Sequence, residues 1–93
     1  MRFEWDENKA ESNFLKHGIQ FEEAVTVFAD PYLMFTADSS HSQGEEREWA
    51  IGETEDGSIV VVVFTMRGER IRIISARKAT KREKRVDTYI SSS

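Results

Sequence analysis

Apolar residues recur along this chain with two spacings, and the spacing separates helices from strands. Phe3-Glu4-Trp5 alternates apolar and polar residues, which predicts a short strand. Asp6 can cap a helix that follows, because its carboxylate can accept hydrogen bonds from the free N–H groups of the first turn. We expect that helix to run to about Lys16 and to stop at Gly18.

A second apolar stripe predicts another helix at about Phe21–Ala29. Four of its residues are spaced i, i+3, i+4 and i+7, and these are Phe21, Ala24, Val25 and Phe28. Gln20 is a poor cap for the first turn, and Pro31 ends the helix. Two helices therefore follow the first strand.

Four further stretches have the composition of strands, and they are Tyr32–Thr36, Arg47–Glu53, Ile59–Met66 and Arg70–Ala76. The third is apolar on both faces, so we expect it in the centre of a sheet. Asp56-Gly57 and Arg67-Gly68 mark turns, which predicts antiparallel neighbours. Alternation sorts the last stretch onto two faces, with Ile71, Ile73 and Ser75 on one and Arg70, Arg72 and Ile74 on the other.

A last helix is predicted from Thr80, which forms a capping box with Glu83. Its apolar stripe is Val86, Tyr89 and Ile90. The order of elements is then a strand, two helices, an antiparallel sheet meander and a C-terminal helix. This segregation predicts an α+β fold, and we expect residues 1–93 to form a single domain.

The composition of the chain excludes several classes of protein. Ten aromatic residues argue against disorder, and the absence of cysteine excludes a disulfide scaffold and a thiolate zinc site. The longest apolar run, Ile59–Phe64, is far shorter than the ~20 residues that span a bilayer. We therefore expect a soluble cytoplasmic protein with no membrane partner.

The net charge of −4 hides an uneven distribution of charge. Nine Lys or Arg and two acids lie between Arg67 and Arg85, a charge of +7, whereas the rest of the chain carries −11. A basic segment of this kind suits an anionic partner such as nucleic acid. A solvated basic helix beside a charged strand face explains the same pattern equally well, so both interpretations stay open.

The two histidines do not form a metal-ligand pattern, since His17 and His41 are 24 residues apart, and we expect no metal site. His17 ends the first predicted helix, where a protonated imidazole has a stabilising role. An imidazole also suits general acid or base catalysis, and a carboxylate such as Glu46 is another candidate base.

Three arginines lie at the ends of predicted strands. Arg47 opens one strand, Arg67 closes the next and Arg77 closes the last. Guanidinium groups that converge on an open sheet face would bind phosphate bidentately and stabilise the charge of a phosphorane. The alternative is that each forms an ordinary surface ion pair. The sequence does not bring Arg67 and Arg77 to one point.

Several motifs, in their order and spacing, resemble the BrnT family of toxins. The first three are Phe3-Glu4-Trp5-Asp6, Lys16-His17-Gly18-Ile19 and Phe21-Glu22-Glu23-Ala24. The next are Val27-Phe28-Ala29-Asp30-Pro31, Gly44-Glu45-Glu46-Arg47 and Ile71-Arg72-Ile73-Ile74-Ser75-Ala76-Arg77. The resemblance covers about residues 3–89, and the stretch from Ile71 into Thr80 is its most specific part.

The resemblance implies a RelE-like fold and a ribonuclease that inhibits translation as the toxin of a type II toxin–antitoxin system. It implies an antitoxin of the BrnA type, a ribbon-helix-helix protein that neutralises the toxin and represses the shared operon. Operator DNA would be reached only through that antitoxin. Relatives of this fold cleave RNA without metal or another cofactor, by attack of the ribose 2′-OH on the adjacent phosphate.

Roles for individual residues follow from the same resemblance. The residues implied for catalysis are His17, Arg47, Arg67 and Arg77. The residues implied for RNA binding are Lys78, Arg70 and Arg72. The alternative is a non-catalytic module that binds nucleic acid or protein through the same basic surface, and only a ribonuclease yields a covalent RNA product.

Overall fold

A computed structural model describes residues 2–38 and 47–84 of the chain. The strands are β1 (Arg2–Glu4), β2 (Met34–Asp38), β3 (Arg47–Glu53), β4 (Ile59–Arg67) and β5 (Arg70–Lys78). The helices are α1 (Glu7–His17), α2 (Phe21–Ala24) and the 3₁₀-helix η1 (Val25–Ala29). A last helix begins at Lys81, as the capping box predicts, and its predicted apolar stripe lies outside the described residues.

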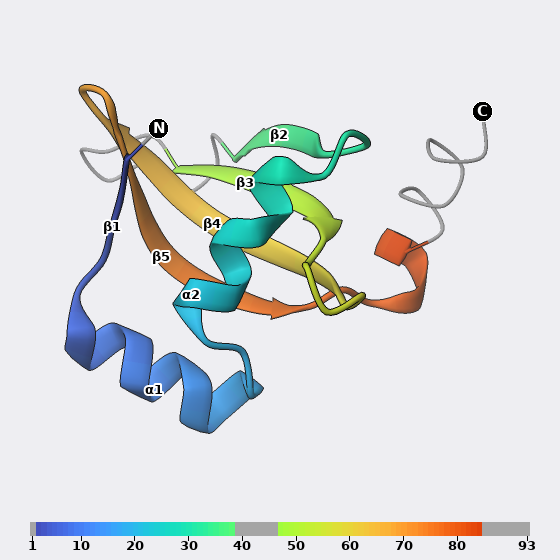
Figure 1. Ribbon diagram of the computed structural model, residues 1–93, viewed down its shortest axis with the longest axis horizontal. Helices are drawn as coiled ribbons and strands as arrows, with labels where there is room; N and C mark the ends of the chain where they lie inside the picture. Colours follow the sequence, from blue (N-terminus) through green and yellow to red (C-terminus); the bar gives the residue numbers. More distant parts are fainter. Residues whose placement is uncertain (1, 39–46, 85–93) are drawn as a thin grey trace.

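The five strands form one mixed sheet in the order β1-β5-β4-β3-β2 (Figure 1). β2, β3, β4 and β5 are antiparallel neighbours, with β4 in the centre as its apolar composition predicts. β1 lies parallel to β5 at the sheet edge. The predicted meander therefore covers four strands only, because three residues of alternating pattern do not indicate which strand they pair with.

The first helix is bounded by the residues that the sequence predicts. The Asp6 carboxylate accepts hydrogen bonds from the backbone N–H groups of Asn8 at 2.8 Å and Lys9 at 3.1 Å. Gly18 stops the helix in the left-handed region with φ 73°, where a residue with a Cβ is strained. Both predicted ends of this helix are confirmed.

The second predicted helix changes its geometry half-way. It starts as one α-helical turn, α2, and continues as the 3₁₀-helix η1. A 3₁₀-helix repeats every three residues, so the fully buried positions are Phe21, Ala24 and Val27. The predicted stripe with a period of 3.6 placed Val25 and Phe28 there instead, and both are only half-buried.

A β-bulge in β5 changes which side chains share a face. Val63 pairs with Ser75 and Phe64 pairs with Ile73, so Ile74 has no partner in the ladder. The extra residue shifts the alternation by one position. Ser75 therefore lies opposite to its predicted face, and Arg77 joins the face of Arg72.

The core lies between the sheet and the helices, with α1 packed over β5 and η1 over β3. Its largest buried side chains are Phe21, Phe64, Ile19, Ile73, Val27, Val60 and Val62.

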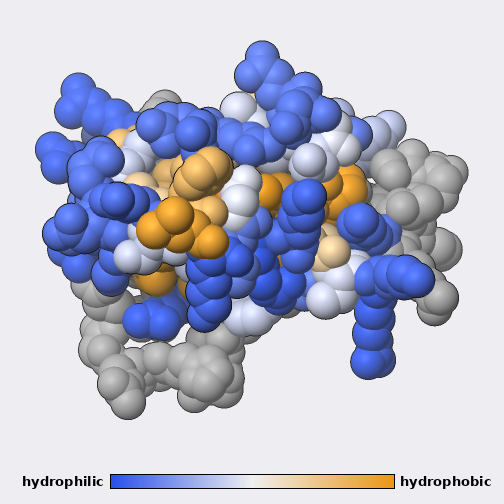
Figure 2. Space-filling model, turned by 90° about the horizontal axis from the view of Figure 1, so that it is seen from below, coloured by the Kyte–Doolittle hydropathy of each residue, from blue (hydrophilic) through white to orange (hydrophobic). Residues whose placement is uncertain are grey.

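Figure 2 looks at the molecule from below the view of Figure 1 and shows mostly hydrophilic surface around a small apolar area. On α1, Phe14 is 46% exposed and Leu15 78%. No helix within the described residues is long and apolar enough to cross a membrane.

Asn13 ties α1 to the free edge of β5. β1 covers that edge only from Arg70 to Arg72. Further along, the Asn13 Oδ1 accepts from the Ala76 N–H at 3.0 Å, and its Nδ2 donates to the Ala76 carbonyl at 2.9 Å and to the Ile19 carbonyl at 3.1 Å. A buried amide side chain therefore replaces the missing neighbouring strand.

Candidate functional site

Helices α1, α2 and η1 pack on one side of the sheet, and we call the opposite side the open face. Within residues 2–38 and 47–84, the start of the last helix is the one helical segment that contacts this face, through Glu83. Strand pairing assigns its side chains, which include Arg47, Trp49, Ile51, Val61, Val63, Arg67, Arg70, Arg72, Ser75 and Arg77. All five arginines of the predicted site in β3, β4 and β5 are on this one face. The bulge at Ile74 is what places Arg77 among them.

The arginines on the open face form two groups at opposite ends. Arg67 pairs with Arg70 at the β4–β5 turn, whereas Arg77 pairs with Val61. Arg67 lies six positions after Val61, which is about 20 Å along a strand at ~3.3 Å per residue. The structure therefore does not bring Arg67 and Arg77 to one phosphate.

Glu4 partly neutralises the group at the β4–β5 turn. Its carboxylate accepts from the Arg72 guanidinium at 2.7 Å and from the Arg70 guanidinium at 3.4 Å. The hydrogen bond from Arg72 is the main reason why the pKa of Glu4 lies below its ordinary value. Arg47, the first residue of β3, is exposed and lies at the same end of the sheet. Its neighbour Glu48 pairs with Phe64, close to the end of β4.

Arg77 at the other end is held from two directions. Its Nη1 and Nη2 donate to the Glu83 carboxylate at 2.8 and 3.0 Å, and its guanidinium carbon stands 5.5 Å from the centre of the Trp49 ring. The bond from Arg77 lowers the pKa of Glu83 to about 2. Glu83 also accepts from the Thr80 N–H at 2.8 Å, so the capping box itself positions this carboxylate.

One edge of the Arg77 guanidinium remains available. A guanidinium has five N–H donors. Three are used, two by Glu83 and one by the Lys78 carbonyl at 3.3 Å. Within residues 2–38 and 47–84, no acceptor takes the Nε–H or the second Nη2–H, and these two lie side by side. This edge can bind two oxygens of a phosphate while Glu83 stays in place.

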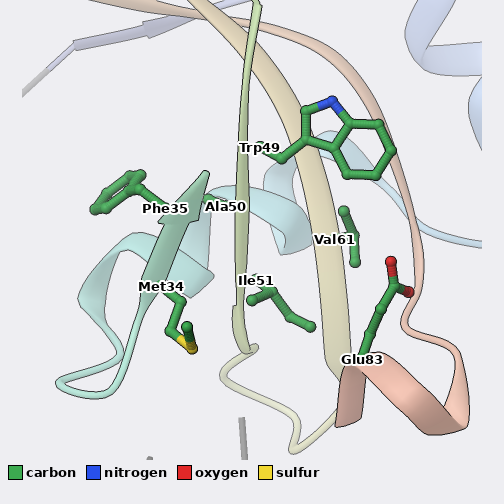
Figure 3. A pocket seen from close by; sticks show the side chains of 7 residues that line it. All are labelled: Met34, Phe35, Trp49, Ala50, Ile51, Val61 and Glu83. Carbon is green, nitrogen blue, oxygen red and sulfur yellow. The ribbon is translucent and has the colours of Figure 1, made fainter. Parts of the chain in front are cut away.

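A hollow of about 190 Å³ lies beside this cluster on the open face (Figure 3). Among the described residues, those that line it are Met34, Phe35, Trp49, Ala50, Ile51, Val61 and Glu83. Most of these are apolar, and Glu83 is the one charged residue among them. Trp49 and Glu83, the two residues that hold Arg77, therefore also line the hollow.

Comparison with known proteins decides the family. Residues 5–83 match the family described as "Ribonuclease toxin, BrnT, of type II toxin-antitoxin system". The chain belongs to the BrnT family. The crystal structure of the ribonuclease toxin BrnT from Brucella abortus matches with a TM-score of 0.64 and 28% sequence identity. This match covers 87% of the present chain and 99% of the Brucella chain, whereas no curated protein matches.

Membership of the BrnT family confirms the resemblance stated from the motifs. It implies an RNA substrate and an antitoxin partner. The α+β fold with its mixed sheet is shared with the Brucella toxin. The RelE-like relationship, the metal-free chemistry and the roles of single residues stay predictions.

Two residues implied by the BrnT resemblance lie away from the arginines. Lys78 pairs with Val60, a core residue, so it lies on the helix side of the sheet, where its charge acts on Glu23. His17 ends α1 on that same side and is half-buried. No residue in the described part of the chain forms a hydrogen bond or ion pair with the His17 side chain.

The candidate base Glu46 and the second histidine, His41, lie outside the described residues. Among the described residues, no group of three or more His, Cys, Asp or Glu side chains is placed to hold a metal ion.

The sequence did not point to two residues of the Arg77 cluster, Trp49 and Glu83. Trp49 shares the alternation of Arg47 and Ile51, so its place on the open face was visible but its contact with Arg77 was not. Glu83 was visible only as the third residue of a capping box. Its bond to Arg77 depends on how the chain turns between β5 and the last helix.

Proposed function

We propose that this BrnT-family chain is a metal-independent endoribonuclease. The 2′-oxygen of a ribose attacks the adjacent phosphorus and forms a P–O bond, while the bond from phosphorus to the 5′-oxygen of the next nucleotide breaks. The 2′-OH loses its proton and the leaving 5′-oxygen gains one. The products are a 2′,3′-cyclic phosphate and a free 5′-OH, so atoms and charge balance without a co-reactant.

The geometry of Arg77 is the observation that carries this proposal. Its Nε–H and second Nη2–H, which donate to no described residue, form a fixed pair of donors, and negative charge grows on the phosphate oxygens in the transition state. Glu83 and Trp49 hold the guanidinium before the substrate arrives, so little reorganisation is needed. Arginine is a poor base, which makes transition-state charge stabilisation its proposed role.

The other predicted residues take separate roles in this proposal. Arg47, Arg67, Arg70 and Arg72 bind the RNA backbone at the far end of the open face. Arg67 thereby keeps the phosphate-binding part of its predicted role but acts on a different phosphate from Arg77. His17 and Lys78 lie on the helix side of the sheet, away from Arg77, so this proposal gives them no part in the reaction. The acid or base role of His17 and the phosphate contact of Lys78 stay predictions.

The family supports the biological setting of the proposal. We propose that the chain cuts RNA in the cytoplasm, inhibits translation there, and is neutralised by a BrnA-like ribbon-helix-helix antitoxin. In this proposal the basic segment Arg67–Arg85 binds RNA. The rest of the chain is acidic and is available to bind a basic antitoxin.

An RNA cleavage assay in EDTA and low salt tests the proposal, with end-group analysis of the fragments. The wild-type protein should yield fragments that end in 2′,3′-cyclic phosphate. Arg77→Ala should lose about 100-fold or more of the cleavage rate. Arg77→Lys should also fail, because lysine cannot present two N–H groups side by side.

Arg82→Ala is the matched control, since it removes one exposed positive charge close to Arg77 in the chain but no contact of the site. It should cleave at nearly the wild-type rate. Equal rates for Arg77→Ala and the wild type would contradict the role of Arg77. RNA that is bound tightly by folded protein but never cut, also with ribosomes present, would favour the non-catalytic binding module.

A further inference from the structure

The hollow on the open face is not used by the chemistry proposed at Arg77. Met34, Ile51 and Val61 supply apolar walls, and Trp49 supplies a flat aromatic ring (Figure 3). Its volume of about 190 Å³ is below the ~300–1,000 Å³ of sites for drug-sized ligands. A space of this size and polarity suits one flat ring system.

The hollow adjoins the cation that binds phosphate in the proposed reaction. Arg77 stands over the Trp49 ring, and Glu83 both holds Arg77 and lines the hollow. A phosphate on the free edge of Arg77 therefore has a neighbouring nucleoside at the mouth of the hollow. Aromatic side chains bind unpaired bases by stacking, whatever the base.

Given an RNA substrate, which rests on the proposed function, we propose that this hollow binds one unpaired nucleobase beside the phosphate held by Arg77. The substrate is then single-stranded at this position. A base inside a duplex is stacked and paired on its edge, so it cannot enter a hollow in a sheet face without leaving the helix.

The rest of the open face suits a single strand that continues from the hollow. Arg72 lies on the same face about 13 Å from Arg77 along the strands, and Arg67 and Arg70 about 20 Å, with the apolar side chain of Val63 between. An aromatic platform with cations on both sides is typical of surfaces that bind single-stranded nucleic acid. The cations take phosphates and the hollow takes a base.

Glu83 gives the hollow a preference among bases. A carboxylate has about four acceptor sites, and two donors of Arg77 and the Thr80 N–H occupy three of them. The remaining acceptor suits the amino group of adenine, cytosine or guanine. Uracil has no amino group, and the two carbonyl oxygens that flank its single N3–H donor repel the carboxylate. We therefore expect uracil to bind least well.

Fluorescence anisotropy with short 2′-O-methyl RNA strands tests this site, because the methyl group blocks the attacking oxygen and separates binding from cleavage. Three probes of equal length are used: oligoadenylate, oligouridylate and a chain with the same phosphates but no bases. Oligoadenylate should bind about 10-fold more tightly than the abasic chain. The affinity for oligouridylate should lie between these two values. In Glu83→Gln the affinity for oligouridylate should come closer to the affinity for oligoadenylate.

Met34→Trp fills the hollow from the edge strand and should remove the advantage of oligoadenylate over the abasic chain, while the affinity for the abasic chain stays the same. Tyr32→Ala is the matched control, since Tyr32 is an exposed aromatic residue close to Met34 that does not line the hollow. It should keep the full advantage. If Met34→Trp does not fold, Trp49→Ala replaces it in the test, because it removes the aromatic ring itself and should also remove the advantage of oligoadenylate.

Equal affinity for oligoadenylate and the abasic chain would overturn the proposal, and so would an advantage that survives in Met34→Trp. A duplex that binds as tightly as the single strand would overturn the requirement for an unpaired base. Failure of the proposed function has a different signature. In that case unmodified RNA stays intact although the base-dependent binding and its loss in Met34→Trp are both observed.

Discussion

Replacing Asn13 with alanine should be one of the most destabilising single substitutions at the buried interface between α1 and β5. The substitution removes three hydrogen bonds, two to the Ala76 backbone and one to the Ile19 carbonyl. Asn13 is only 7% exposed, so water does not easily replace its amide group. Three backbone groups would be left without partners.

The size of the effect follows from these bonds. A typical buried hydrogen bond contributes about 1 kcal/mol net to the free energy of unfolding, so three contribute about 3 kcal/mol. The whole free energy of unfolding of a domain of this length is about 5–14 kcal/mol. With a urea m-value of ~1.5 kcal/mol per M, the unfolding midpoint of Asn13→Ala should fall by about 2 M.

Urea unfolding of the purified variants measures this change, and hydrogen exchange of the Ala76 amide shows where it acts. Asn13→Asp keeps the acceptor but loses both donors and brings a carboxylate into a buried site, so it should be at least as destabilising as alanine. Ser12→Ala, an exposed neighbour on the same helix, should change the midpoint very little.

A loss of less than about 1 kcal/mol in Asn13→Ala, with unchanged exchange of the Ala76 amide, would refute the reasoning. It would mean that the edge of β5 does not depend on this side chain. A large loss with unchanged Ala76 exchange would equally contradict it, because the damage would then lie elsewhere.

Two further predictions concern packing and pH. Gly52→Ala should destabilise the protein by about 1–3 kcal/mol, because the new Cβ would lie 3.1 Å from the Leu33 side chain and 3.2 Å from Val27; an unchanged melting temperature would contradict this. The pKa of Glu83 is lowered to about 2 by Arg77, so its pair stabilises the fold above the ordinary glutamate pKa of ~4.3 and loses that effect as the pH falls toward 2. The difference in melting temperature between wild type and Glu83→Gln should therefore shrink on going from pH 7 to pH 3, and a constant difference would show that the ion pair contributes nothing.

Much of the local structure could be predicted from the sequence because its causes are local. Asp6 and Gly18 act on backbone groups within a few residues, so the ends of α1 follow directly from their chemistry. The apolar run in β4 places that strand in the centre, whatever its neighbours are. The motifs were also sufficient to identify the BrnT family, and the basic segment contains four arginines of the open face, Arg67, Arg70, Arg72 and Arg77.

The tertiary structure decided what depends on long-range contacts. The parallel pairing of β1 with β5, the role of Asn13 at that edge and the 3₁₀ geometry of η1 have no local signal. The arrangement of the site belongs to the same class. A single bulge at Ile74 brings Arg77 to the open face, because one extra residue reverses every later side chain of a strand.

The candidate site therefore combines both kinds of information. Its residue types, arginine for phosphate above all, were set by the sequence. Their division into two groups about 13–20 Å apart, and the fixing of Arg77 by Glu83 and Trp49, arose only when distant segments met. Local chemistry determines which residues a strand or helix contains, whereas the register between strands determines which of them can act on the same molecule.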